Sequence, residues 1–157
     1  MLLTPHILAG VAIGASTDNV YWIIILAILS HFLLDTIPHT DWGMWHDYKP
    51  FKLEKKDYIL VICDSILSLT LLVYLWFNIE LSPLMLIGGL SAILIDLIDN
   101  VPFWNKRIRK IGIFNKLHAF HNKINYKLKS KHWYWGVLSQ LAIIGGTIWY
   151  LKEFLSL

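Results

Sequence analysis

The sequence predicts an all-α protein, an integral membrane bundle of about five helices with a further amphipathic helix on the membrane surface. Hydrophobic residues make up 56% of the 157 residues, more than the roughly 45–50% expected of a soluble domain. The mean hydropathy of +0.53 agrees with this composition. The apolar residues fall into stretches separated by turn residues. Residues 1–157 are therefore expected to form a single membrane-embedded domain.

The apolar stretches are the expected helices, and they cover residues 4–16, 20–37, 58–77, 84–98 and 133–151. The second, third and fifth approach the roughly 20 residues that cross a bilayer. The first is short, so it either tilts or enters the membrane without crossing it. The fourth contains Gly88 and Gly89, small residues that let helices approach closely.

The basic residues indicate how the protein is oriented. Of the 14 Lys and Arg residues, all but Lys152 lie in the connections 49–56 and 106–131. Alternating spans place both connections on one side of the membrane, and the positive-inside rule makes this the cytoplasmic side. The opposite connections carry only Asp18 and Glu80 as charged residues. We therefore expect a multi-pass protein of the cell (inner) membrane, with its basic connections in the cytoplasm.

The connection 106–131 is compatible with two kinds of partner. Its Lys and Arg residues alternate with aromatic residues such as Tyr126, a pattern that nucleic-acid-binding proteins also use. Anionic lipid headgroups are the nearer partner and require no further assumption. The membrane surface is therefore favoured over nucleic acid.

The same connection predicts the amphipathic surface helix. Apolar residues recur in it at intervals of three or four, as in a helix lying on a membrane; they are Ile108, Ile111, Phe114, Leu117, Ile124 and Leu128. His121 falls at the centre of this apolar face and His118 at its edge. A histidine on a lipid-directed face requires an explanation. It would have one if this helix covered a polar site and His121 closed that site.

Histidine and aspartate residues interrupt the apolar stretches at matching depths. Counted from the expected turns at roughly 1.5 Å per residue, His6 and His31 share one level, and Asp64 and Asp96 share another. All four fall in the cytoplasmic half of the expected membrane. Further polar residues mark the cytoplasmic helix exits, and they are His39, Asp41 and Asp99.

The spacing of these residues predicts that their side chains face one another. His31 and Asp35 are four residues apart and project from one helix face, and His6 shares a stripe with Gly10 and Gly14. A lone histidine in such a helix is more often a packing residue, whereas carboxylates inside a membrane are usually functional. The first four apolar stretches contain no Lys or Arg. Metal ions, protons and histidines are therefore the expected partners of the carboxylates.

The donor atoms indicate which metal would bind. Imidazole and carboxylate groups without thiolate suit zinc, with manganese as the alternative. The candidate donors outnumber a single tetrahedral site, so a cluster of about two or three ions is expected. Such a cluster can lower the pKa of water and stabilise charge that develops on a phosphoryl oxygen.

Motifs along most of the chain resemble the YdjM-like family of membrane-bound metal-dependent hydrolases, distant relatives of zinc-dependent phospholipase C and related single-strand nucleases. The motifs are Thr-Pro-His at 4–6, Ser-His-Phe-Leu-Leu-Asp at 30–35 followed by Pro38-His39, Ile-Asp-Leu-Ile-Asp at 95–99, and His-Ala-Phe-His at 118–121. The resemblance implies His31 and Asp35 as central metal ligands. It implies that the shell is completed by His6, His39, Asp64, Asp96 and one of His118 or His121.

The expected function is phospholipase C-like, metal-dependent hydrolysis of a phosphoester in a phospholipid or lipid-linked phosphate. Asp41, Asp64 or Asp99 would orient the attacking water. One alternative is a metal or proton transporter, although the outer halves of the expected helices offer few polar groups for a relay. The other is a non-catalytic membrane protein with a structural metal site.

Overall fold

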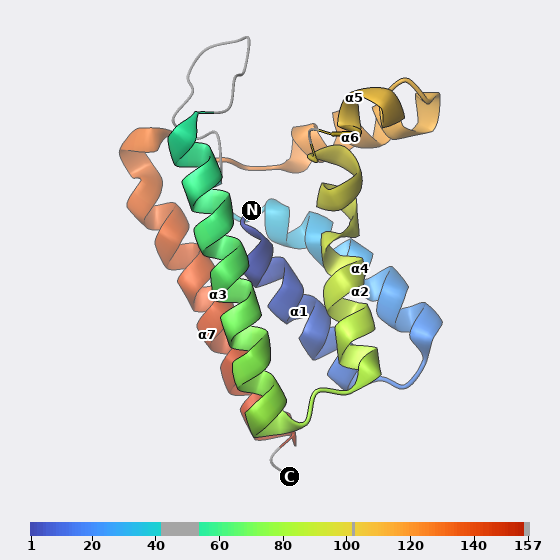
Figure 1. Ribbon diagram of the computed structural model, residues 1–157, viewed down its shortest axis with the longest axis vertical. Helices are drawn as coiled ribbons and strands as arrows, with labels where there is room; N and C mark the ends of the chain where they lie inside the picture. Colours follow the sequence, from blue (N-terminus) through green and yellow to red (C-terminus); the bar gives the residue numbers. More distant parts are fainter. Residues whose placement is uncertain (42–53, 102, 156–157) are drawn as a thin grey trace.

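The computed structural model describes residues 1–41, 54–101 and 103–155, and these residues form helices and no strands (Figure 1). The predicted all-α class is confirmed. The elements are α1 (Leu3–Ser16), α2 (Val20–Asp35), α3 (Lys55–Ile79), α4 (Pro83–Asp99), α5 (Asn105–Ile108), α6 (Gly112–Ile124), the 3-10 helix η1 (Ser130–His132) and α7 (Trp133–Leu155).

Helix α1 is the central element of the bundle. It packs against α2, α3, α4 and α7, and its contact with α4 is the most extensive helix–helix contact in the described chain. Helix α4 packs on α2 as well, whereas α3 packs on α1 and α7 (Figure 1). The positions of α2, α3, α4 and α7 therefore all depend on contacts with α1.

Glycines make the close α1–α4 contact possible. A Cβ atom on Gly10 would overlap the carbonyl group of Gly88, and a Cβ atom on Gly88 would overlap the carbonyl group of Gly10. Gly89 is less crowded, with its nearest neighbour, the Ile7 carbonyl oxygen, at 3.3 Å from an added Cβ. The predicted role of these small residues in close helix approach is confirmed.

The amphipathic segment forms a shorter helix than its apolar pattern predicts. Helix α6 ends at Ile124, and the following residues are extended beside the chain segment that leaves α2. His39 donates its backbone N–H to the Tyr126 carbonyl at 3.2 Å, and Leu128 donates to the His39 carbonyl at 2.9 Å. Backbone groups that would extend α6 therefore bond instead to the segment that follows α2.

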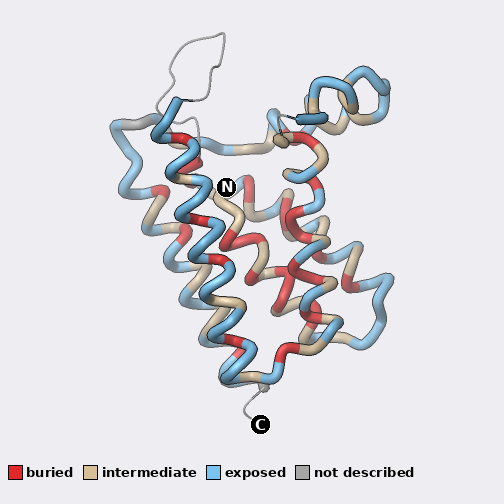
Figure 2. The backbone as a smooth tube through the Cα atoms, viewed as in Figure 1, coloured by how far each residue is buried: buried red, intermediate tan, exposed pale blue. Residues whose placement is uncertain are grey.

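Burial divides the bundle into an apolar half and a polar half. The apolar core lies near the turn between α3 and α4, and it contains Leu8, Val11, Leu75, Leu81, Met85 and Leu151. At the other end, where α1 begins and α2 and α4 end, the buried side chains are largely polar. Buried positions concentrate on α1 and α4, while α3 is exposed along much of its length (Figure 2).

One described helix, α3, is both long and apolar enough to cross a membrane. Helices α1 and α2 are also apolar but shorter.

We predict that Gly88→Ala destabilises the protein, because the new methyl group meets the backbone of Gly10 and forces α1 and α4 apart. The expected loss in the free energy of unfolding is about 1–3 kcal/mol or more. Thermal unfolding of the detergent-solubilised protein, followed by circular dichroism, measures it. Gly145→Ala is the matched control, because a Cβ there meets nothing within 4 Å and alanine favours helix by about 1 kcal/mol. Equal effects of the two substitutions would contradict the prediction.

Candidate metal centre

The carboxylate of Asp35, at the last residue of α2, is the centre of the polar half. It is fully buried, and imidazoles from separate elements surround it. Its Oδ1 lies 3.4 Å from His6 Nε2 and 3.9 Å from His39 Nε2. Its Oδ2 lies 3.5 Å from His31 Nε2 and 2.7 Å from His121 Nε2. The structure thus gathers residues that the sequence separates by more than a hundred positions.

Backbone contacts fix the ring orientation of two of these histidines. His31 donates from Nδ1 to the Ala92 carbonyl at 2.8 Å, and His39 donates from Nδ1 to the Ile37 carbonyl at 2.8 Å. Because a carbonyl only accepts hydrogen bonds, Nδ1 carries the proton in both rings. Nε2 of each ring then faces the carboxylates as a potential ligand, which is the usual arrangement of metal-binding histidine.

Buried nitrogen atoms without hydrogen bonds are suited to bind a cation. His6 is fully buried, and neither of its ring nitrogens makes a hydrogen bond to the residues that the structure describes. Within the described ranges, Nε2 of His39 is also buried without a hydrogen-bond partner. The His6 ring stacks on His31 with 4.2 Å between centroids, so the predicted common depth of these two residues is confirmed. Such orphaned polar atoms are rare in proteins, and metal coordination would satisfy them.

Helix α4 contributes two carboxylates with different surroundings. Asp96 Oδ1 lies 3.8 Å from His31 Nε2 and 3.9 Å from His121 Nε2, within the reach of a shared ion. Asp99 instead contacts the two histidines of α6, because its Oδ2 accepts from His118 Nδ1 at 2.8 Å and lies 3.4 Å from His121 Nδ1. Its Oδ1 accepts from Arg109 Nε at 2.8 Å. Asp99 therefore orients the histidines of α6.

Two overlapping groups of donors could hold a metal ion. One contains His6, His31 and Asp96, and the other contains His31, Asp35 and His121; within each group the donor atoms lie within 4.8 Å of one another. The nitrogen and oxygen donors suit zinc or another borderline divalent ion. Both groups use His31, so one compact centre is favoured. The identity of the metal and a count of two or three ions stay predictions.

Positive charge already lies against these carboxylates. The Met1 ammonium group donates to Asp35 Oδ1 at 2.6 Å and lies 3.9 Å from Asp41 Oδ2. Lys127 Nζ lies 2.6 Å from the same Asp41 oxygen. The sequence pattern indicates neither contact, because no spacing rule relates residues so distant in the chain.

The electrostatic effect of the cluster is visible in His121 and His39, which lie outside the predicted membrane-spanning stretches. Burial alone would lower the pKa of His121, but hydrogen bonds to Asp35 and Asp99 outweigh it and raise this pKa to about 9. Burial lowers the pKa of His39 to about 4, so its imidazole is neutral at pH 7. The carboxylates around His121 favour a cation, and a metal ion would compete with the proton there.

Asp64 makes contacts that its spacing in the sequence did not predict. Its carboxylate accepts hydrogen bonds from the Leu3 N–H at 2.6 Å and the Thr4 hydroxyl at 2.6 Å. These contacts cap the start of α1, where the local N-cap residue Leu2 offers no side-chain acceptor. Asp64 belongs to neither donor group, so its function as a ligand or as a base stays a prediction.

Asp41 lies at the edge of the cluster and is buried. Burial opposes ionisation of its carboxyl group, but the nearby Met1 ammonium and Lys127 outweigh this and lower its pKa. Three carboxylates were predicted to orient water. Asp41 is ionised beside the cluster, whereas Asp99 contacts His118 and His121 and Asp64 caps the start of α1.

Comparisons with known proteins found no matching family model, no matching curated protein and no matching solved structure. The family resemblance of the motifs stays a prediction.

We predict that purified wild-type protein contains bound zinc or manganese and that Asp35→Ala loses it. Asp64→Ala should keep the metal while its free energy of unfolding falls by about 0.5–2 kcal/mol, because the cap of α1 is removed. Elemental analysis and thermal unfolding of the detergent-purified variants measure the two effects. His132→Ala, which changes an exposed histidine, is the control. Loss of metal in Asp64→Ala with retention in Asp35→Ala would reverse the assignment.

We also predict that Asp99→Asn weakens metal binding by about 10–100-fold without abolishing it, because Asp99 orients His118 and His121. Competition with a chelating dye at fixed pH measures the affinity. Asp18→Asn, at an exposed position far from the cluster, is the matched control. An unchanged affinity in Asp99→Asn would show that the histidines of α6 need no such support.

Proposed function

We propose that this protein is an integral membrane, metal-dependent phosphoesterase that acts on a phospholipid or lipid-linked phosphate at the cytoplasmic headgroup level. The convergence of His6, His31, His39 and His121 on the Asp35 carboxylate carries the proposal. Several of these imidazole nitrogens have no hydrogen-bond partner in the described chain. Metal coordination accounts for such a set better than packing does.

The burial pattern of α3 supports a membrane environment. Its buried residues are Asp57, Asp64, Ser68 and Leu75. Its exposed surface instead carries large apolar side chains, among them Ile62, Ile66, Leu69, Trp76 and Phe77. Exposed apolar surface of this extent marks contact with a partner or a membrane, and polar groups inside a membrane protein face the bundle interior. A lipid environment explains both sides of α3.

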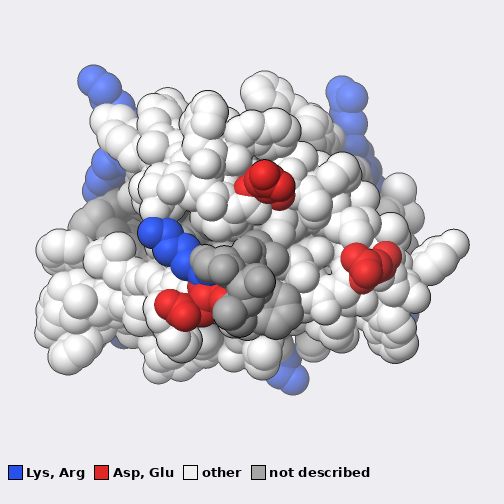
Figure 3. All heavy atoms as spheres, turned by 90° about the horizontal axis from the view of Figure 1, so that it is seen from below, with Lys and Arg blue, Asp and Glu red and all other residues white. Residues whose placement is uncertain are grey.

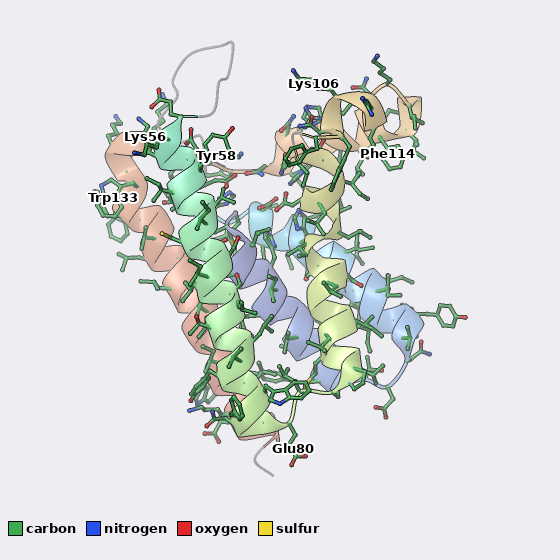
Figure 4. All side chains as sticks on the ribbon, viewed as in Figure 1. Lys56, Tyr58, Glu80, Lys106, Phe114 and Trp133 are labelled. Atoms are coloured by element: carbon green, nitrogen blue, oxygen red, sulfur yellow. The ribbon has the colours of Figure 1, made fainter. Side chains whose placement is uncertain are left out.

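The charge distribution supports the proposed orientation. Lys56 and Lys106 lie at the end of the molecule that carries the cluster, and Glu80 lies at the opposite end (Figure 4). The opposite end presents a mostly uncharged surface with a few scattered charges (Figure 3). The positive-inside rule would place the cluster and the basic residues on the cytoplasmic side, where anionic headgroups attract Lys and Arg.

Each part of the cluster has a defined contribution to the proposed reaction. His6, His31, Asp35, Asp96 and His121 would hold the ions. Divalent ions at such a site activate water and stabilise charge on a phosphoryl oxygen. Asp41 lies 3.9 Å from the Met1 ammonium that also contacts Asp35 and would help to orient the water, and Asp99 would position the α6 histidines. In the net hydrolysis, the hydroxyl of water joins phosphorus, the P–O bond to the leaving alcohol breaks, and that alcohol takes the remaining proton.

The apolar half of the bundle favours an enzyme over a transporter. A transport relay requires polar groups that continue across the membrane. Among the described residues, the half opposite the cluster is closed by the core around Leu8, Val11 and Leu75. In the described chain, the buried polar groups therefore gather at one end of the bundle and do not continue through this core.

We expect the metal-loaded protein to hydrolyse a phosphoester in phosphatidylglycerol vesicles, releasing a product that mass spectrometry identifies. His31→Ala should lower the rate by more than about 100-fold, since it removes a nitrogen shared by both donor groups. A chelator should abolish the activity, and zinc or manganese should restore it. His132→Ala should retain wild-type activity. Wild-type protein that holds stoichiometric metal but cleaves no phosphoester would identify the metal as structural.

A further inference from the structure

A cavity of about 190 Å³ lies beside the candidate metal centre, and residues from the start of α1, from α3 and from the end of α4 line it. Apolar side chains form most of its walls: Leu2 and Leu3 from the start of α1, Tyr58 and Val61 from α3, and Leu97 and Val101 from the end of α4 and beyond. Tyr58 lies near the cluster end of α3 (Figure 4).

The cavity and the candidate metal centre share Asp96. This residue lines the cavity, and its Oδ1 lies 3.8 Å from His31 Nε2. The other cavity-lining carboxylates hold backbone groups, because Asp64 caps α1 and Asp57 accepts from the Glu54 N–H at 2.8 Å. A molecule in the cavity would therefore reach the cluster at Asp96.

The walls of the cavity continue onto the outer surface of the bundle. Val61 and Leu97 are each more than a third exposed. Helices α3 and α4 are held apart there because α3 packs on α1 and α7 while α4 packs on α1 and α2. In the proposed membrane orientation, this flank faces acyl chains just below the headgroups.

The size of the cavity limits what it can hold. Pockets that enclose a whole ligand usually measure about 300–1,000 Å³, so this cavity has room for only part of a lipid. Its apolar walls suit hydrocarbon, and its Asp96 end suits the neighbourhood of a metal-bound phosphate.

We propose that this cavity is a lateral entrance that takes the hydrocarbon segment nearest to the phosphate of a membrane lipid. The rest of the lipid stays in the bilayer while its phosphate meets the cluster. The substrate class is then a phospholipid entering sideways between α3 and α4, in preference to a water-soluble phosphoester. This inference rests on the proposed function for its catalytic consequence, while the binding of lipid in the cavity is measurable without catalysis.

The first test fills the cavity by Val61→Trp. The ratio of kcat/KM on dioleoylphosphatidylglycerol vesicles to kcat/KM on soluble bis(p-nitrophenyl) phosphate should fall by about tenfold or more, the range expected when a hydrocarbon fit is lost. Val73→Trp is the matched control, because Val73 is exposed on the same helix outside the cavity. An unchanged ratio in Val61→Trp, or an equal fall in the control, would overturn the lateral entrance.

The second test measures binding alone. A phosphatidylcholine with a diazirine on its acyl chain next to the glycerol should crosslink, on illumination, to peptides that contain Val61 or Leu97, and Val61→Trp should reduce this crosslinking. Crosslinking there without hydrolysis of either substrate would support the entrance and contradict the enzyme. Hydrolysis without crosslinking at these positions would support the enzyme and overturn the entrance.

Discussion

The burial of the Asp35 carboxylate constrains the rest of this structure. An ionised group away from water is costly unless cations or hydrogen-bond donors surround it. Here the compensation comes from the Met1 ammonium before α1, at 2.6 Å, and from His121 on α6, at 2.7 Å. His6 and His39 lie near the same carboxylate from α1 and from the segment after α2. These elements must end at one level, and the close contact of Gly10 with Gly88 lets α1 sit deep enough among its neighbours to reach that level.

Helix α4 is the scaffold that orients the donors. Its Ala92 carbonyl fixes the His31 ring, Asp96 faces the inner cluster, and Asp99 holds the histidines of α6. One helix thus supplies a backbone acceptor, a candidate ligand and a positioning carboxylate within two turns. Because second-layer contacts of this kind set ligand orientation, the packing of α4 on α1 and α2 is part of the chemistry of the site as well as of the fold.

Local periodicity predicted the parts of the site that lie on single helices. The four-residue spacing of His31 and Asp35 places both on one face, and counting from the turns puts His6 level with His31. The role of Asp64 could not be read in this way, because it caps a different helix whose own N-cap, Leu2, lacks an acceptor. The apolar pattern also did not predict that α6 ends at Ile124. The backbone after Ile124 bonds to the backbone of His39, and no local sequence pattern indicates a contact between such distant residues.

Helix α6 contacts the cluster and, under the proposed function, would also contact the membrane surface. Its contacts with the bundle include the polar pairs of His118 and His121 and the ring contact of Phe120 with Phe32 at 5.4 Å. Ile113 on the same helix is 71% exposed, as expected of a side chain that enters the headgroup region. Under the proposed function, metal ligands and lipid would hold the same short helix, so ions bound at His121 would favour the position of α6 next to the cluster. The position of α6, the loading of metal and contact with the membrane would then stabilise one another.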